Sequence, residues 1–402
     1  MNLKKIVLSM SIVTLVSCSG DEDGYTDISN ENSDTTENPT FTGSLTVLQN
    51  VFGDNIDPNN LDNYANQVVP NYVTKDNTGG NTITDAKATL GRVLFYDKNL
   101  SVDNTIGCAS CHQQAFAFGD SNDVSTGVNG VTGRHSMRLI NTRFARETRF
   151  FWDERANTLE EQTTQPIQDH AEMGFSGQNG DPALSDLLIK LEALDYYQEL
   201  FQFAYGNTTI TEARLQESMA QFIRSIQSFD AKYDVGRSVV QNDNQQFPNF
   251  TAQENEGKDL FFRPPNENGA GCITCHAAPE FDIDPMSLNN GVIGIFADAT
   301  ATDLTVTRAP TLRDVFNSSG VINGALMHDA SMASATDAIE HYNDIDATGN
   351  TNLDNRLRGG PGGNGQNLNL TTAEIQALEA FIKTLSGTSV YTDTKWSDPF
   401  IN

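Results

Sequence analysis

The chain has 402 residues, and its 53 acidic and 25 basic side chains give it a formal net charge of -28 at pH 7. Such an acidic chain excludes nucleic acid as a natural partner, because phosphates would repel it, and it favours a basic protein partner. The alternative is that the acidic surface only maintains solubility.

The first predicted element is an export signal, in which a short basic start precedes an apolar run from Ile6 to Val16. This run is too short to cross a bilayer. The segment Leu15–Cys18 is similar to the lipobox of bacterial lipoproteins. We therefore predict a signal peptide over residues 1–17 and a lipidated Cys18 that anchors the exported protein on the periplasmic side or in the cell envelope. Ordinary cleavage, which would leave Cys18 free, is the alternative.

A polar, acidic stretch over residues 18–44 follows the signal, and it is too poor in apolar residues to fold, which predicts a disordered tether. The mature chain, about 380 residues, is long enough for two domains of ordinary size. We place the first domain at residues 45–232 and the second at 251–402. The polar, turn-rich segment over residues 233–250 is the predicted linker.

Apolar residues recur with helical periodicity in the rest of the chain, and no run alternates as a half-buried strand does. We therefore predict a mainly α-helical fold. Amphipathic helices are expected over residues 84–97 and 211–229. Capping boxes indicate the start of two more helices, Thr251 with Glu254 and Thr371 with Glu374, and the second of these helices is expected to end at Gly387.

A C-x-x-C-H motif occurs twice, as GCASCH at residues 107–112 and GCITCH at residues 271–276. This spacing is the attachment signature of c-type haem, in which two thioether bonds hold the porphyrin and the adjacent histidine binds the iron. With Cys18 assigned to lipid, no cysteine is left for a disulfide. The sequence thus predicts two covalently bound haem c groups, attached by two cysteine pairs and ligated by two histidines: Cys108, Cys111 and His112, then Cys272, Cys275 and His276.

Two other uses of these motifs were weighed. A zinc site built from both cysteine pairs would join segments about 160 residues apart and leave both histidines unexplained. A thioredoxin-like redox motif would be expected once, at a strand-to-helix junction, and neither copy follows a strand pattern.

From about Leu90 to Gly387 the chain resembles bacterial di-haem cytochrome c peroxidases, of the superfamily that contains MauG. The resemblance rests on the second haem motif and on these segments: LGRVLFYDKNLSVDNTIGCASCH, RFFWDERANTLEEQTTQPIQDHAEMGF, TRAPTLRDVFNSSGVINGALMHD and DAIEHYND. It implies two cytochrome c-like haem domains, of which the first reacts with hydrogen peroxide. The second relays electrons from a donor such as a small c-type cytochrome. A homodimer is also common in the family.

Cleavage of the peroxide bond requires an acid and a base that move a proton between the two oxygens. The resemblance places the family's distal glutamate at Glu172 and its distal glutamine at Gln162. Trp152 matches a tryptophan that lies between the two haems. The alternative for Glu172 and Gln162 is that each is an exposed polar residue with no catalytic role. The alternative for Trp152 is that it only packs in the core. His170 is either a further pocket residue or a surface group.

The chain departs from the classical peroxidases of the family in the segment STGVNGVTGRHSMRLIN, where those enzymes carry a histidine that caps the resting first haem. Here the corresponding residues are Gly127, Val128 and Asn129. We therefore predict that the first haem is open even when oxidised, so that no reductive activation is needed. His135 is an alternative ligand. By resemblance, His135 occupies the position of an asparagine that helps to bind calcium, which keeps one calcium ion as a candidate cofactor.

A second departure concerns the distal ligand of the second haem, which in classical members is a methionine at a fixed distance after an HDG-like segment. The same distance in sequence, counted from His328, leads to Tyr342, and MauG enzymes have a tyrosine at this position. His328 itself is expected near a haem edge. Several other residues stay open as alternatives: Met332, Met327, Met286 and His341.

Three functions are therefore considered. The first is a cytochrome c peroxidase, the second is a MauG-like enzyme that uses peroxide to oxidise a protein or organic substrate, and the third is a non-catalytic electron carrier. The carrier would have two six-coordinate, low-spin haems, whereas either enzyme needs one haem with an open face.

Overall fold

The computed structural model describes residues 39–146, 149–282, 285–360 and 363–401, which belong to one compact unit. The predicted signal peptide, Cys18 and most of the predicted tether lie outside these residues. Within them, no helix is both long and apolar enough to span a membrane. We call residues 39–232 the first half and residues 251–401 the second half.

The predicted mainly helical fold is confirmed, and the described residues contain isolated β-bridges but no sheet. The α-helices of this part of the chain are α1 (Leu45–Phe52), α2 (Asp85–Tyr96), α3 (Cys108–Cys111), α4 (Leu159–Thr164), α5 (Leu184–Glu192), α6 (Asp195–Tyr205), α7 (Glu212–Ser225), α8 (Lys232–Ser238), α9 (Ala252–Phe262), α10 (Ala335–Asn343) and α11 (Thr372–Lys383).

All four predicted helices are present, as α2, α7, α9 and α11. Both capping boxes form. The Thr251 hydroxyl accepts a hydrogen bond from the Glu254 amide, and the Glu254 carboxylate accepts one from the Thr251 amide at 2.6 Å. The Thr371 and Glu374 pair makes the same two contacts at the start of α11.

The predicted end of the last helix at Gly387 is wrong, because α11 ends at Lys383. Gly387 has a different structural role. Its amide donates to the buried Asp314 carboxylate at 2.9 Å. A Cβ at this position would lie 2.3 Å from an Asp230 carboxylate oxygen, so glycine here allows close packing rather than ending the helix.

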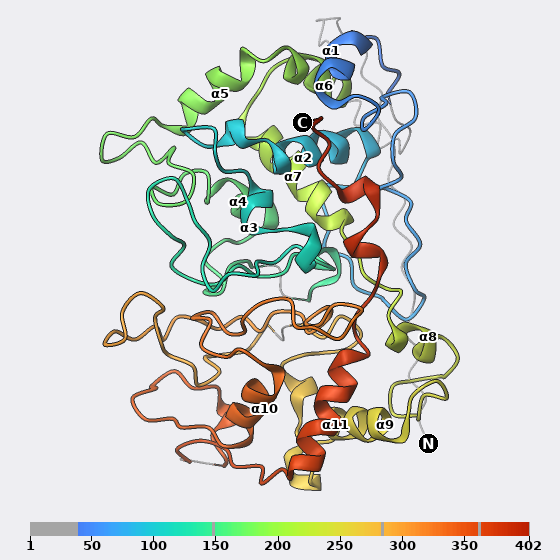
Figure 1. Cartoon of the computed structure of the whole chain (residues 1–402), viewed down its shortest axis with the longest axis vertical. Coiled ribbons are helices and arrows are strands. Elements are labelled where there is room, and N and C mark those ends of the chain that lie inside the picture. The colour runs from blue at the N-terminus through green and yellow to red at the C-terminus, as the bar shows by residue number, and fades with distance from the viewer. Residues whose placement is uncertain (1–38, 147–148, 283–284, 361–362, 402) are drawn as a thin grey trace, which may run out of the picture. The chain divides into compact units, whose positions relative to one another are not determined.

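Each half is built on one closely packed helix pair, α2 with α7 and α9 with α11, as Figure 1 shows. A glycine lies at each crossing. A Cβ at Gly91 would approach the Ser218 carbonyl oxygen to 2.0 Å, and a Cβ at Gly257 would approach that of Ala377 to 1.8 Å. In each half, the helix that carries this glycine, α2 or α9, precedes the haem motif in the chain. The two halves therefore repeat the same order of helix and motif.

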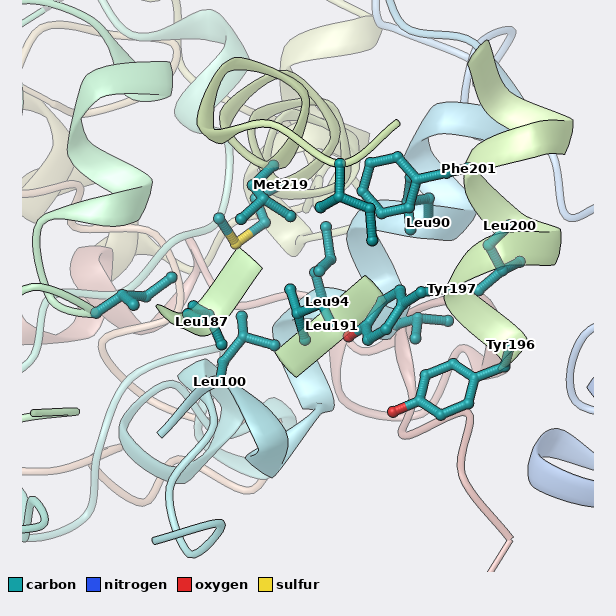
Figure 2. Packing of buried hydrophobic residues seen from close by; sticks show 14 of the residues in the cluster. Leu90, Leu94, Leu100, Leu187, Leu191, Tyr196, Tyr197, Leu200, Phe201 and Met219 are labelled. Carbon is teal, nitrogen blue, oxygen red and sulfur yellow. The ribbon is translucent and has the colours of Figure 1, made fainter. Parts of the chain in front are cut away.

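The apolar core of the first half surrounds the α2–α7 pair and includes side chains of α5 and α6 (Figure 2). Leu94 on α2 and Leu191 on α5 are fully buried, and Met219 on α7 is 1% exposed. Burial of each such side chain contributes about 1.5–3 kcal/mol. Met219 also lines the cavity described below, so the core and the site share a wall.

After α11 the chain returns to the first half. The Tyr96 hydroxyl donates to the Trp396 carbonyl oxygen at 2.7 Å, and the buried Arg92 donates from Nε to the Ser397 carbonyl oxygen at 2.7 Å. The predicted linker over residues 233–250 contains most of α8. The predicted domain boundaries stay predictions.

Candidate active site

The histidines of the two C-x-x-C-H motifs are held in the same way. His112 follows the short helix α3, and its Nδ1 is 3.1 Å from the carbonyl oxygen of Phe118. The Nδ1 of His276 is 3.3 Å from the carbonyl oxygen of Phe281. A carbonyl at Nδ1 fixes the tautomer in which Nε2 is free to bind a metal, which is the usual arrangement for ligand histidines.

Burial supports the same role for both imidazoles, because it lowers the pKa of His112 and lowers the pKa of His276 to about 4. Both rings are therefore neutral at physiological pH, as a metal ligand must be. The two phenylalanines that supply the carbonyls are fully buried and have positive φ angles, 58° at Phe118 and 54° at Phe281.

The four motif cysteines are free thiols and are half-buried. Among the residues that the structure describes, no group of three or more histidine, cysteine or acidic side chains is placed to hold a metal ion. The two cysteine pairs therefore do not assemble a zinc site. Two free thiols beside one correctly held histidine, present twice, fit two c-type haems.

A cavity of about 510 Å³ adjoins the first motif. Its size lies within the usual range for ligand sites, about 300–1,000 Å³. Cys108, Cys111 and His112 form part of its wall, and Met173 and Met219 bring core side chains to it. Residues of the second half, His328 among them, complete the lining.

Glu172 lines this cavity, as predicted for a distal residue, and its amide donates to the Asp169 carboxylate at 3.1 Å. Burial and the neighbouring charge of Asp169 raise the pKa of the Glu172 carboxyl to about 7, against a smaller lowering effect from Arg155. A carboxyl group with a pKa near neutrality can both accept and return a proton, which is the property that a general acid–base residue needs.

Gln162 lies on α4 and lines the same cavity. Thr158 caps the helix: its hydroxyl accepts a hydrogen bond from the Glu161 amide at 3.1 Å, and this cap fixes the start of the turn that carries Gln162. Arg155 reaches the cavity from the preceding loop, with its guanidinium 3.5 Å from the centre of the Phe151 ring. Both predicted distal residues thus face one space with His112.

Trp152 also lines the cavity, at a point where the two halves meet. Its indole Nε1 donates to the His135 carbonyl oxygen at 2.7 Å, and its own carbonyl oxygen accepts from the Thr307 and Arg308 amides, each at 3.0 Å. The ring also lies edge-on to His328, 6.1 Å between centres. One hydrogen bond thus holds the indole ring, and two more hold the Trp152 backbone.

His135 is 6% exposed, and its Nδ1 lies 3.0 Å from the Asn122 carbonyl oxygen and 3.1 Å from that of Asp123. Calcium at this position stays a prediction. His170 does not line the cavity. Its Nδ1 pairs with Asp181 at 2.7 Å on the exposed side of the segment, which fits the surface role.

At the second motif, Tyr342 on α10 accepts a hydrogen bond at 3.0 Å from the side chain of Asn290. The same Asn290 nitrogen lies 3.4 Å from the Met327 sulfur. Burial raises the pKa of Tyr342, and the nearby Cys275 and Cys272 contribute to that rise. Both candidate ligands therefore lie in one place, and the choice of Tyr342 stays a prediction.

The remaining alternatives are less well placed. Met286 is 81% exposed, and Met332 is half-buried and pairs through its backbone with Leu326. His341 uses Nε2 in a 3.0 Å hydrogen bond with the Asn290 carbonyl oxygen.

Sequence reasoning missed Arg138 and Asn290. Arg138 lines the first cavity and donates to the Thr311 carbonyl oxygen at 3.0 Å, while its buried Nε has no hydrogen-bond partner among the residues that the structure describes. Burial lowers the pKa of this guanidinium. Arg138 lies in the segment SMRLIN, but a single arginine among apolar residues does not by itself indicate a site, so the sequence offered no means of assigning it.

Replacing both Cys272 and Cys275 with alanine is expected to halve the haem content, from two haems per chain to one, because each motif attaches its own cofactor. Quantification of haem against protein after denaturation measures this directly. Cys18→Ala is the matched control, since it removes the remaining cysteine and should leave both haems attached. Loss of both haems, or of neither, would contradict independent attachment.

A family model described as di-haem cytochrome c peroxidase matches residues 85–244. Methylamine utilization protein MauG of Methylophilus methylotrophus is 29% identical over 314 residues, which cover 76% of this chain and 84% of that protein. Cytochrome c551 peroxidase of Nitrosomonas europaea is 25% identical over 311 residues, or 75% of this chain and 80% of its own. The crystal structure of a MauG-like protein associated with microbial copper homeostasis has a TM-score of 0.65 at 26% identity, and covers 83% of this chain and 99% of that one.

Proposed function

Because this chain belongs to the superfamily of di-haem cytochrome c peroxidases and MauG enzymes, we propose that it reduces hydrogen peroxide to water at its first haem site. Its electrons would come from a small c-type cytochrome or a similar donor through the second haem site. The observation that carries the proposal is that His112, Glu172 and Gln162 line one cavity, in which the pKa of Glu172 is raised to about 7.

When bound, the haem supplies an iron that binds peroxide and accepts electrons. The chain supplies the proton movement. The Glu172 carboxylate accepts the proton of one peroxide oxygen and donates it to the other oxygen. The O–O bond then breaks, and the oxygen that received the proton leaves as water. Gln162 offers an amide N–H that orients the peroxide. With two electrons and two protons, one peroxide becomes two waters.

Trp152 is the residue that we assign to the electron path between the two sites. Its hydrogen bonds to His135, Thr307 and Arg308 join both halves, and its ring faces the cavity. A fixed aromatic ring shortens the distance that electrons must cross without covalent connection. Arg134 lies nearby and pairs with Asp153 at 2.8 Å and with Asp303 at 2.7 Å. The second of these ion pairs adds another contact between the two halves.

MauG-like oxidation of a protein or organic substrate is the second candidate function. It is favoured by the position of Tyr342 beside the cysteines of the second motif, because an anionic tyrosine ligand lowers the reduction potential of a haem relative to a methionine ligand. The third candidate, a non-catalytic carrier, has no use for a cavity lined by Glu172.

We also propose that the protein is exported and anchored through a lipid on Cys18, and that its acidic surface attracts a basic donor. The net charge of -28 supports the second part, because complementary charge accelerates the association of electron-transfer partners. Homodimerisation is kept as an expectation of the family.

The proposed function is tested by peroxide-dependent oxidation of a reduced small cytochrome c by the haem-loaded protein. The fully oxidised enzyme is compared with enzyme that first receives one electron. Immediate turnover by the oxidised form is expected, with no further gain after the electron is added. No oxidation of the cytochrome by either form, together with oxidation of an organic donor, would overturn the peroxidase assignment in favour of MauG-like chemistry.

A further inference from the structure

The segment Gly127–Asn129 is bonded to the backbone of the segment that carries Glu172. The Val128 amide donates to the Glu172 carbonyl oxygen at 3.0 Å, and the Asn129 amide donates to the Ala171 carbonyl oxygen at 3.2 Å. The Asn129 side chain adds a third bond, to the His170 carbonyl oxygen at 3.0 Å. Three consecutive carbonyl groups of the Glu172 segment are therefore held by one loop.

The two backbones also touch, and this contact requires glycine at one position. A Cβ at Gly127 would lie 2.1 Å from the Ala171 carbonyl oxygen and 2.7 Å from the Cα of Glu172. No rotation of a side chain can relieve an overlap of this kind, because both neighbouring atoms belong to the backbone. Any side chain at residue 127 must push the Glu172 segment away.

The loop itself is anchored at its base. The Thr132 amide donates to the Ser125 carbonyl oxygen at 2.9 Å, and the Ser125 amide donates to the Thr132 hydroxyl at 3.0 Å. The Ser125 hydroxyl donates to the buried Asp120 carboxylate at 2.5 Å. Asp120 follows the first haem motif closely in the chain, so the loop connects the cofactor-attaching segment to the segment of Glu172.

We propose that residues 125–132 form a fixed brace that positions Glu172 in the wall of the first cavity, and that Gly127 is the positioning residue of this brace. The inference rests on the proposed role of Glu172 and extends it. It also assigns a function to the loop in which classical peroxidases carry a capping histidine: here this loop holds the acid–base residue in place.

The brace is tested with Gly127→Ala in the haem-loaded, full-length protein, with Gly130→Ala as the matched control. Gly130 lies in the same loop, and a Cβ there would meet only the Ala171 methyl group, at an ordinary contact distance of 3.6 Å. Haem content and the ferric absorption spectrum establish that both variants are folded and loaded.

Gly127→Ala is expected to slow the reaction with peroxide at least tenfold and to move the midpoint of its pH profile below that of the wild type, because a displaced Glu172 is less buried. Gly130→Ala should match the wild type in both. Asn129→Ala, which deletes one bond without an overlap, should shift the midpoint in the same direction by a smaller amount. Wild-type rate and pH profile in Gly127→Ala would overturn the brace.

Hydrogen exchange of the Val128 and Asn129 amides separates failure of the brace from failure of the proposed function. If the wild-type protein does not react with peroxide, the proposed function fails. The brace still predicts slow exchange at both amides in the wild type and in Gly130→Ala, and fast exchange in Gly127→Ala. Fast exchange in the wild type would overturn it whatever the activity.

Discussion

Glu172→Gln is expected to slow the reaction of the oxidised enzyme with hydrogen peroxide by about 100- to 10,000-fold, the range that a general acid–base residue supplies. Glutamine has the same shape and still forms hydrogen bonds, but it cannot carry a proton from one oxygen to the other. Stopped-flow absorption at several peroxide concentrations gives the second-order rate constant.

His170→Gln is a close control for this substitution. His170 lies two residues from Glu172, but its side chain pairs with Asp181 and does not line the cavity. Its replacement should leave the rate within about twofold of the wild type, as for most surface changes. Equal losses in both variants would show that the segment, and not the carboxyl group of Glu172, is what the reaction requires.

The wild-type reaction should also depend on pH in a direction set by Glu172. Since burial raises the pKa of this carboxyl to about 7, the proton-accepting carboxylate form predominates above neutrality and the protonated form below it. The rate is expected to rise about tenfold per pH unit in the acid range and to level off above about pH 7. The rise should be absent in Glu172→Gln. A wild-type rate that does not change across this range would contradict the assignment.

Tyr342→Met is expected to raise the reduction potential of the second haem by on the order of 100 mV or more, because a neutral thioether stabilises oxidised iron less than an anionic phenolate oxygen does. Spectroelectrochemical titration of the variant and the wild type measures the shift. A higher potential at this haem should also weaken MauG-like oxidation more than peroxide reduction.

Met327→Leu is the informative comparison, since Met327 shares the side chain of Asn290 with Tyr342. If Tyr342 is the ligand, Met327→Leu should leave both the potential and the ferric spectrum unchanged. A changed spectrum in Met327→Leu, with an unchanged one in Tyr342→Phe, would transfer the ligand assignment to Met327.

The features that the sequence predicts well are those encoded within a few residues. The haem motifs are complete within six residues each, and the capping boxes of α9 and α11 within four, so both are readable without the fold. The end of α11 could not be read in this way, because Gly387 lies beyond the helix and packs against Asp230, which is distant in sequence.

The cavity depends on contacts that no local pattern contains. Trp152 was identified by resemblance, but its hydrogen bond to the His135 carbonyl oxygen is a property of the folded chain. The sequence around Arg138 does not show that the arginine itself is buried, which only the fold brings about. One feature of the sequence could have predicted the two helix crossings. The segments GRVLFY and GKDLFF are similar, and the glycine that begins each one lies at a crossing.

We propose that the first haem site is open in the oxidised enzyme and that Glu172 acts there as the acid–base residue. The most direct test is electron paramagnetic resonance of the fully oxidised, haem-loaded protein before any reductant or peroxide is added. An open first site should give a high-spin ferric signal from the first haem, beside the low-spin signal of a six-coordinate second haem. Two low-spin haems, with no high-spin signal, would contradict it.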